Sequence, residues 1–311
     1  MRRRSRQGDE EERARAEASL REIEAGGLPL AAQERLRQVG KRSRFFTSDL
    51  STNEFLLIRE AGFRPLTQVM GSCFYHVGWQ WTPGGAMYGA GMAGLSGAGQ
   101  SWELETQTEA WNEARRLALG RLAEEARLAG ADAVVGVRLT RGAYDWSRDV
   151  IEFVASGTAV ASERYELGET PMLSNLSGQE FAALFRHGFW PAGLVAGTTV
   201  IYVMAGWQQQ QAGFALGGSA FQNQEFPDFT QGVYDARSQA MLRATRQAHE
   251  AGAHGLLGVA IETSHEEREV DQGGGSKRRD LIVTLHVLAT SVFELARGEP
   301  DPPVYVAVPL T

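Results

Sequence analysis

The chain has 311 residues, of which 43% are hydrophobic and 22% are charged, so it can bury enough apolar surface to fold. Its net charge of −7 disfavours a protein that follows the phosphate backbone, and we expect no nucleic-acid partner. The single cysteine, Cys73, excludes an intramolecular disulfide framework and every multi-cysteine metal site. No apolar run reaches the roughly 18 residues of a membrane-spanning helix, and the N-terminus lacks a hydrophobic signal region, so we expect a cytoplasmic protein.

Residues 1–45 form a charged N-terminal arm. The arm contains twelve Lys or Arg and eight Asp or Glu, a net charge of +4 that leaves −11 for the rest of the chain. Residues 9–24 predict a solvated helix that ends at Gly26 and Gly27, and a second short helix is expected near Pro29. The apolar residues are too few for an independent core, so we predict a short helical arm that is partly flexible.

The first six residues of the arm include four arginines, Arg2, Arg3, Arg4 and Arg6. This cluster could contact anionic lipid or nucleic acid, and the arm as a whole could bind an unknown protein partner or an anionic membrane surface. A solvated tail is the simpler interpretation, because four charges gain only a few kcal/mol near such a surface.

An internal repeat covers most of the remaining chain. Nine residues recur 126 positions later, from Leu50 with Leu176 to Gly71 with Gly197. Residues 130–137 then match residues 252–259 at an offset of 122, so the intervening loops differ in length by four residues. We predict two tandem domains, residues 46–168 and a diverged copy at residues 169–298, followed by a C-terminal tail at residues 299–311.

Each repeat has the predicted order strand, helix, strand, strand. Alanines at three- and four-residue spacing predict a helix in each copy, ending at Gly130 and Gly252. The predicted strands are residues 69–77, 133–139 and 150–160 in the first copy and residues 195–203, 255–261 and 281–292 in the second. Polar loops are expected at residues 140–148 and 263–279. The predicted fold class is α+β, with two β-α-β-β units that each have a three-stranded antiparallel sheet and one helix.

One face of each predicted sheet lacks a covering helix. The strands at residues 150–154 and 281–287 carry hydrophobic side chains on both alternating faces, which is typical of strands buried on both sides. A single unit cannot supply that burial, so either the two repeats pack on each other or several chains do. We therefore expect a homo-oligomer.

Three segments of the first repeat resemble the YbjQ family, also called UPF0145. They are residues 111–115 in the predicted helix, the Gly-Ala-Asp-Ala turn with its strand at residues 130–137, and Ser-Gly-Thr-Ala-Val at residues 156–160. The second repeat departs from this pattern, because His254 replaces the aspartate and Ala-Thr-Ser-Val stands at residues 289–292. The resemblance implies dodecin-like units, assembly into five-fold rings and a family label of heavy-metal binding without an established activity.

From the resemblance we expect a non-enzymatic scaffold or binding protein that forms pentamer-based rings and holds no cofactor. The alternative is a ring that binds a metal or a small ligand. Five chains would supply ten units, as stacked or face-to-face rings, whereas pairing of the two repeats within a monomer would need no second chain.

Few residues have the spacing of metal ligands. Cys73 and His76 are three residues apart on a predicted strand, so they point to opposite faces and cannot share one ion. A second group lies near the helix end and the following loop of the second repeat, where solvated side chains are the simpler interpretation. Its members are His249, His254, Glu262, His265, Glu266 and Glu267.

The long loops carry two further candidate features. The glycine-rich residues 84–99 lack the context of a nucleotide-binding loop. They favour a loop that packs on a neighbouring subunit or lines a ring opening, while their counterpart at residues 207–221 differs in polarity. Five aromatic residues flank these loops, and interface packing is favoured over stacking of a planar ligand. They are Trp79, Trp81, Trp102, Tyr202 and Trp207.

Catalysis would need paired titratable groups at a subunit junction. The candidates in the first repeat are Asp132, Glu103 and Glu105. Cys73 has no recognisable His and acid partners, and no nucleophile elbow is present, so we predict that the chain is not an enzyme.

Overall fold

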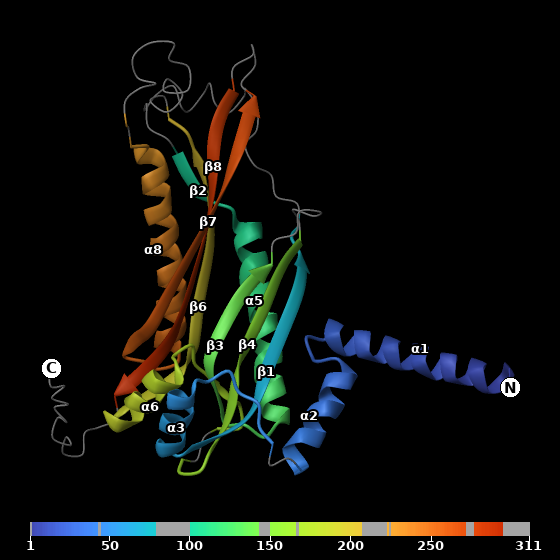
Figure 1. Cartoon of the computed structure of the whole chain (residues 1–311). Helices are drawn as coiled ribbons and strands as arrows, with labels where there is room; N and C mark the ends of the chain where they lie inside the picture. The colour runs from blue at the N-terminus through green and yellow to red at the C-terminus, as the bar shows by residue number, and fades with distance from the viewer. Residues whose placement is uncertain are drawn as a thin grey trace.

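The computed structural model describes residues 2–42, 45–78, 100–142, 150–165, 168–206, 223, 225–271 and 277–294. These residues form six helices and two four-stranded sheets (Figure 1). The arm contains α1 (Arg2–Glu24) and α2 (Leu30–Arg42). The residues between the arm and residue 168 are here called the first half. It contains α3 (Thr52–Glu60), β1 (Phe63–His76), β2 (Gln100–Glu103), α5 (Glu105–Leu128), β3 (Ala133–Gly142) and β4 (Val150–Ser162). The second half contains β5 (Met172–Leu173), α6 (Gly178–Arg186), β6 (Phe189–Met204), α8 (Pro227–Glu250), β7 (Gly255–Asp271) and β8 (Lys277–Glu294).

Both helices predicted in the arm are present, and α1 points away from the sheets in Figure 1. The turn between them is fixed to α5, because Arg121 donates hydrogen bonds to the carbonyls of Gly27 (3.1 Å) and Ile23 (3.0 Å). Leu28 and Leu36 are buried beside Ala129 at the end of α5. Among the described residues, no helix is both long and apolar enough to cross a lipid bilayer.

The two halves share an antiparallel core with the strand orders β1-β4-β3 and β6-β8-β7. The α+β class is confirmed, but three-stranded, dodecin-like units are not, because each sheet has a fourth strand. β2 of the first half pairs with β6, and β5 of the second half pairs in parallel with β3. These strands of four and two residues are too short to show a hydrophobic period, and only tertiary contacts fix them.

Two short helices, α3 and α6, were not predicted. Each begins with a capping box, in which Ser51 caps the amide of Glu54 and Ser177 caps that of Glu180, while each glutamate accepts a hydrogen bond from its serine amide. The serine and glutamate positions belong to the repeat, so a Ser-x-x-Glu signal was present in the sequence.

The polar loop predicted at residues 263–279 is wrong over most of its length. β7 and β8 extend through it as a hairpin, with pairing from Gly255 opposite Val292 to Asp271 opposite Lys277. Both faces of this extension carry polar side chains, so no alternation marks it as a strand. Cross-strand charge pairs replace apolar contacts there, as between Lys277 and Glu269 (2.9 Å).

A stripe of buried alanines lets each long helix lie close to its own sheet. The two stripes contain Ala114, Ala118 and Ala126 on α5 and Ala236, Ala240, Ala244 and Ala248 on α8. A Cβ atom added at Gly71 or Gly197 would lie 2.1 Å from the carbonyl oxygen of Ala118 or Ala240, respectively. Glycine is therefore required where helix and strand are closest.

The two sheets differ in what covers their second face. One face of the second sheet packs on α8, and Val200, Tyr202 and Ile282 on its other face pack against the first half. The corresponding face of the first sheet is open, where Met70 is 51% exposed and Phe74 is 58% exposed. Packing of the two repeats on each other, one of the two alternatives, thus covers the open face of one sheet only.

Candidate functional site at the junction of the two sheets

The junction forms where α5 of the first half runs along the edge of β6. Asn112 donates to the carbonyl of Thr198 (3.0 Å) and accepts from its amide (3.1 Å), as a neighbouring strand would. One turn earlier, Thr108 accepts from the amide of Val200 (2.9 Å). The helix therefore takes the place of a strand at this edge and brings its polar side chains onto the second sheet.

Arg115 is the most deeply buried cation at this junction. Its guanidinium donates to Oγ1 of Thr198, to Oδ1 of Asn112 (2.6 Å) and to the carbonyl of Ala196 (3.3 Å). Burial and then repulsion from Arg243 lower the pKa of Arg115 to about 10, which still leaves it charged at neutral pH. All three acceptors are neutral, and no described carboxylate forms an ion pair with Arg115.

His286 lies opposite Arg115 on β8. Its Nδ1 atom is 2.9 Å from Oγ1 of Thr198, and its ring packs edge-on against Trp111 (4.9 Å between centroids) and Phe153 (5.9 Å). Burial, followed by the charges of Arg141 and Arg115, lowers the pKa of His286 well below 6.5. Nε2 of His286 is buried and has no hydrogen-bond partner among the described residues.

A cavity of about 370 Å³ separates β3 from β7 and β8 at this point. Arg115, His286 and Phe153 line it together with Arg138 and Arg141 of β3. The only carboxylate among its lining residues is Glu262, which pairs with Arg141 at 3.2 Å. The cavity therefore carries an excess of positive charge.

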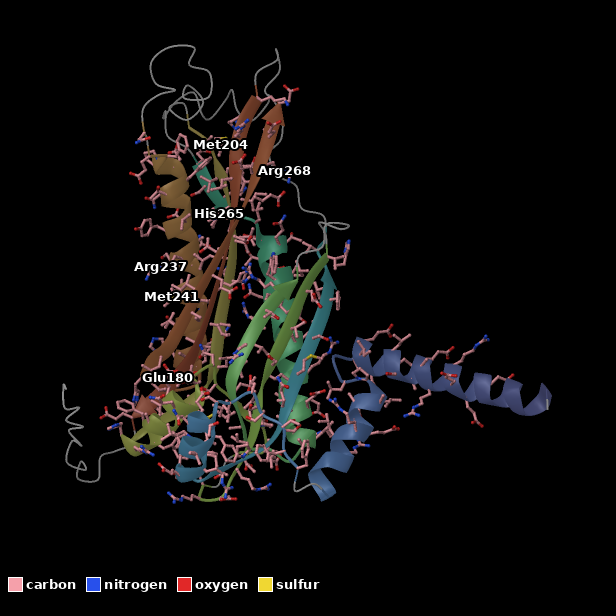
Figure 2. All side chains as sticks on the ribbon, viewed as in Figure 1. Glu180, Met204, Arg237, Met241, His265 and Arg268 are labelled. Atoms are coloured by element: carbon pink, nitrogen blue, oxygen red, sulfur yellow. The ribbon has the colours of Figure 1, made fainter. Side chains whose placement is uncertain are left out.

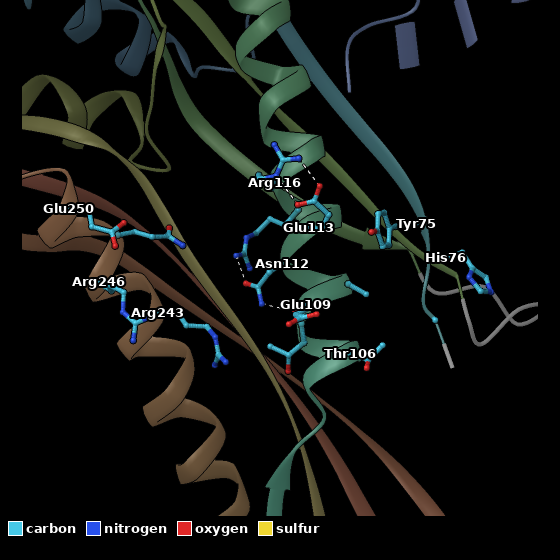
Figure 3. A pocket seen from close by; sticks show the side chains of 15 residues that line it. Tyr75, His76, Thr106, Glu109, Asn112, Glu113, Arg116, Arg243, Arg246 and Glu250 are labelled. Carbon is cyan, nitrogen blue, oxygen red and sulfur yellow. Dashed lines mark hydrogen bonds and ion pairs between the residues drawn. The ribbon is translucent and has the colours of Figure 1, made fainter. Parts of the chain in front are cut away.

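A larger hollow of about 930 Å³ lies between α5 and α8 (Figure 3). Its wall mixes acids and bases, and Arg116 bonds Glu113 on the same helix (2.6 and 2.7 Å). Figure 3 shows Arg243 and Arg246 of α8 facing it from the other side. This hollow is a solvated groove lined by four arginines and three glutamates, so most of its charges compensate each other.

The residues considered as metal ligands do not converge. Cys73 is buried against α5, and burial raises the pKa of its thiol, while His76 lines the solvated groove. His265, Glu266 and Glu267 lie on β7 rather than in a loop (Figure 2). Among the residues that the structure describes, no three His, Cys, Asp or Glu side chains are placed to hold one metal ion.

The candidate catalytic acids are also separated. Asp132 accepts from the amide of Ser162 (2.8 Å) beyond one end of α5, and Glu103 pairs with Arg243 (2.6 Å) before its other end. Glu105 lies in the first turn of α5, a helix of 24 residues that spans about 36 Å. These three acids do not form a site.

Of the five aromatic candidates, Trp102 and Tyr202 are described. Their rings stack at 4.8 Å within the apolar cluster beneath β2, which agrees with a packing role. Trp79, Trp81 and Trp207, the glycine-rich residues 84–99 and their counterpart at 207–221 lie outside the described residues.

Sequence reasoning missed Arg115 and His286. Arg115 follows Ala114 on the helix, and His286 interrupts the apolar run of residues 281–292. A histidine in the middle of a strand that is apolar on both faces was the available signal. The sequence does not show that the second sheet packs on α5, and only this packing brings His286 next to Arg115.

A comparison with known proteins finds a relative that matches nearly the whole chain. Over 293 residues it is 37% identical to the encapsulin nanocompartment protein Rv1762c of Mycobacterium tuberculosis (strain ATCC 25618 / H37Rv), covering 91% of this chain and 98% of that protein. The chain belongs to the family of that protein.

The predicted YbjQ/UPF0145 relationship is confirmed for part of the first half. Residues 88–163 match the family described as "Putative heavy-metal-binding". A UPF0145 protein of Enterococcus faecalis is 43% identical over 72 residues, 23% of this chain and 63% of its own length. The UPF0145 protein BH0643 of Halalkalibacterium halodurans is 39% identical over 75 residues, 24% of this chain and 65% of its own length. Duplication of this domain in the second half stays a prediction.

The predicted function, a pentamer-based ring scaffold or a ligand-binding ring, is wrong. That expectation came from a resemblance to UPF0145 proteins, which match only about a quarter of the chain. The relative that matches nearly the whole chain is a nanocompartment protein. Neither description names a reaction, so the absence of enzymatic activity stays a prediction, as do the cytoplasmic location and a partner for the arm.

Proposed function

We propose that this chain is a self-assembling subunit of a protein nanocompartment. The similarity to the encapsulin nanocompartment protein supports this function. The structural observation that carries it is the outer edge of β7, which is open although the equivalent edge of β3 in the first half is covered.

The edge of β3 is covered by residues 172–176, which follow the first half directly. The amide of Ser174 donates to the carbonyl of Val134 (2.9 Å), and the carbonyl of Ser174 accepts from the amide of Val137 (2.9 Å). Under this segment Val135 is 0% exposed and Val137 is 3% exposed. A short segment is therefore sufficient to bury this edge.

The equivalent positions of β7 are exposed. Leu257 and Val259, which lie 122 residues after Val135 and Val137, are 40% and 42% exposed, and Ile261 is 41% exposed. β7 is the terminal strand of its sheet. A long strand edge with apolar side chains is a template for pairing with another chain, and natural proteins rarely leave one uncovered.

Residues 46–50 of a second copy fit this edge, because they are the repeat counterpart of residues 172–176. Asp49 donates its amide to Oγ1 of Thr158 (3.3 Å) as Asn175 does to Oγ1 of Thr290 (3.1 Å). Both segments are thus held in the same way on their own sheets. Within the chain, residues 172–176 pair with the edge of β3, whereas Thr47 of the earlier segment contacts β1 of its own sheet through its side chain.

The resulting contact is head-to-tail, since each copy offers one segment and one open edge. Such a heterologous contact repeats from copy to copy and joins many subunits. The faces beside the two elements agree with it, since Met70 of the first sheet and Tyr234 of α8 are 51% and 61% exposed. Tyr234 lies 122 residues after Asn112, which packs on the second sheet within the chain.

The substitution Val259→Glu tests the edge directly. Because burial of a carboxylate without a partner is energetically unfavourable, the variant should be monomeric under conditions where the unmodified protein assembles. Leu20→Glu on α1, where the leucine is 58% exposed, is the matched control and should assemble normally. Native mass spectrometry gives the subunit count and circular dichroism verifies folding. A monomeric unmodified protein, or a Val259→Glu protein that assembles normally, would overturn the proposal.

A cross-link tests which segment occupies the edge. Leu173 lies opposite Val134 in the covered edge, and the counterparts are Thr47 and Leu256. The double variant Thr47→Cys/Leu256→Cys should form a ladder of disulfide-linked chains on oxidation, and either single variant should not. Cys73 is 3% exposed and does not interfere. Absence of the ladder in an assembled double variant would exclude residues 46–50 as the occupant.

A further inference from the structure

The cavity between the two sheets has features of a binding site that the assembly of subunits does not use. Its volume of about 370 Å³ is several times the roughly 30 Å³ that one water molecule occupies in the liquid. It lies within a single chain, between β3 of the first sheet and β7 and β8 of the second. A molecule of several heavy atoms can therefore fit without a second copy.

The charge of the wall selects the kind of molecule. Arg115 is buried and charged, and its described acceptors are the neutral oxygens of Thr198, Asn112 and Ala196. A buried cation without a counter-charge is strongly unfavourable. Glu262 compensates Arg141 but not Arg115. An anion in the cavity would supply the missing charge.

The hydrogen bonds around Thr198 determine which ring nitrogen of His286 carries the hydrogen. Oγ1 of Thr198 accepts from Arg115, and its own hydrogen has Nδ1 of His286 as the described acceptor (2.9 Å). Because Nδ1 then accepts, the neutral imidazole carries its hydrogen on Nε2. Nε2 is buried without a partner in a residue that lines the cavity. His286 thus carries an unpaired N–H donor, and the hydroxyl of Thr198 joins its ring to the buried guanidinium.

We propose that this cavity binds a small oxyanion, a phosphate or a carboxylate, through Arg115 and Nε2 of His286. A guanidinium matches both groups, because they offer two oxygens to its planar N–H donors. Arg138 at the cavity wall adds to the attraction, while Glu262 already compensates Arg141. The binding site joins the two halves of one chain, since Arg115 comes from α5 and His286 from β8.

The test titrates the full-length protein, labelled with ¹⁵N-histidine, with sodium phosphate and separately with sodium acetate at constant ionic strength. Occupancy should shift the Nε2 signal of one histidine, and that signal should be absent from His286→Gln. Calorimetry should show affinity at least 10-fold weaker in both Arg115→Gln and His286→Leu, which lacks the donor. A response to phosphate alone or to acetate alone identifies which oxyanion the site takes.

Arg237→Gln is the matched control for surface charge. Arg237 is exposed on α8, at the position 122 residues after Arg115, and Figure 2 labels it there. This variant should bind like the unmodified protein. No shift with either anion, or equal weakening in Arg237→Gln, would overturn the proposal. If Arg115→Gln does not fold, His286→Leu, which removes the donor and keeps an apolar side chain, decides the matter alone.

Discussion

The first and second halves of the molecule have the same core but opposite exposure at their sheet edges. In the first half, Val135 on β3 is fully buried, whereas its counterpart Leu257 on β7 is 40% exposed. Both positions are apolar, so the second half carries the sequence of a covered edge without the cover. The comparison shows that the chain covers the edge of β3 with its own residues but leaves the apolar side chains at the edge of β7 exposed.

The largest effect is expected at a repeated phenylalanine. Phe181 on α6 is 0% exposed and packs against Phe63 with ring centroids 5.3 Å apart, so Phe181→Ala should lower the free energy of unfolding by about 3–5 kcal/mol. Its counterpart on α3, Phe55, is only partly buried and stacks on Phe46. Phe55→Ala should cost less than half as much. Urea unfolding measures both variants.

A concentration series sharpens that comparison. At concentrations where the protein assembles, the cost of Phe55→Ala should rise towards that of Phe181→Ala, because α3 directly follows residues 46–50, which the proposal places on a second copy. Equal costs at a concentration where the chain is monomeric would contradict the difference between the halves.

The sequence predicted the repeated parts of this fold and missed the parts that depend on packing between the halves. The alanine stripes and the terminal Gly130 and Gly252 located α5 and α8. β2 and β5 were missed because each belongs to a sheet in the other half, and strands this short carry no period. Nothing local distinguishes Arg115 from a surface arginine, since the second sheet alone buries it.

An intermediate effect is expected from pH through His286, which lies in the second half. His286 has no histidine counterpart, because Val154 occupies the equivalent position of β4, opposite Ser72 as His286 is opposite Thr198. The charged groups that share the cavity wall with His286 are Arg115 of α5, Arg138 and Arg141 of β3 and Glu262 of β7.

The sign follows from the lowered pKa of His286 in the folded chain. Below about pH 6.5 the unfolded chain takes up a proton at this residue and the folded chain does not, so stability falls as the pH decreases. The slope is at most about 1.4 kcal/mol per pH unit. Between pH 6.5 and 5.5, urea unfolding of His286→Gln should show a shallower decline than the unmodified protein. If the stability of both proteins declined with the same slope, His286 would not be the source of this pH dependence.

The smallest effect is expected at the charge pair between α3 and α6. Arg186 and Glu60 lie 2.5 Å apart, but their side chains are 50% and 65% exposed, so water screens the pair. Arg186→Ala should change the free energy of unfolding by less than about 1 kcal/mol, and a double-mutant cycle with Glu60→Ala should give a coupling of about 0.2–1 kcal/mol that shrinks in high salt. The apolar contacts of Phe181 a short distance away hold the same two helices together. A coupling of several kcal/mol would instead mean that charge, rather than apolar contact, holds α3 and α6 together.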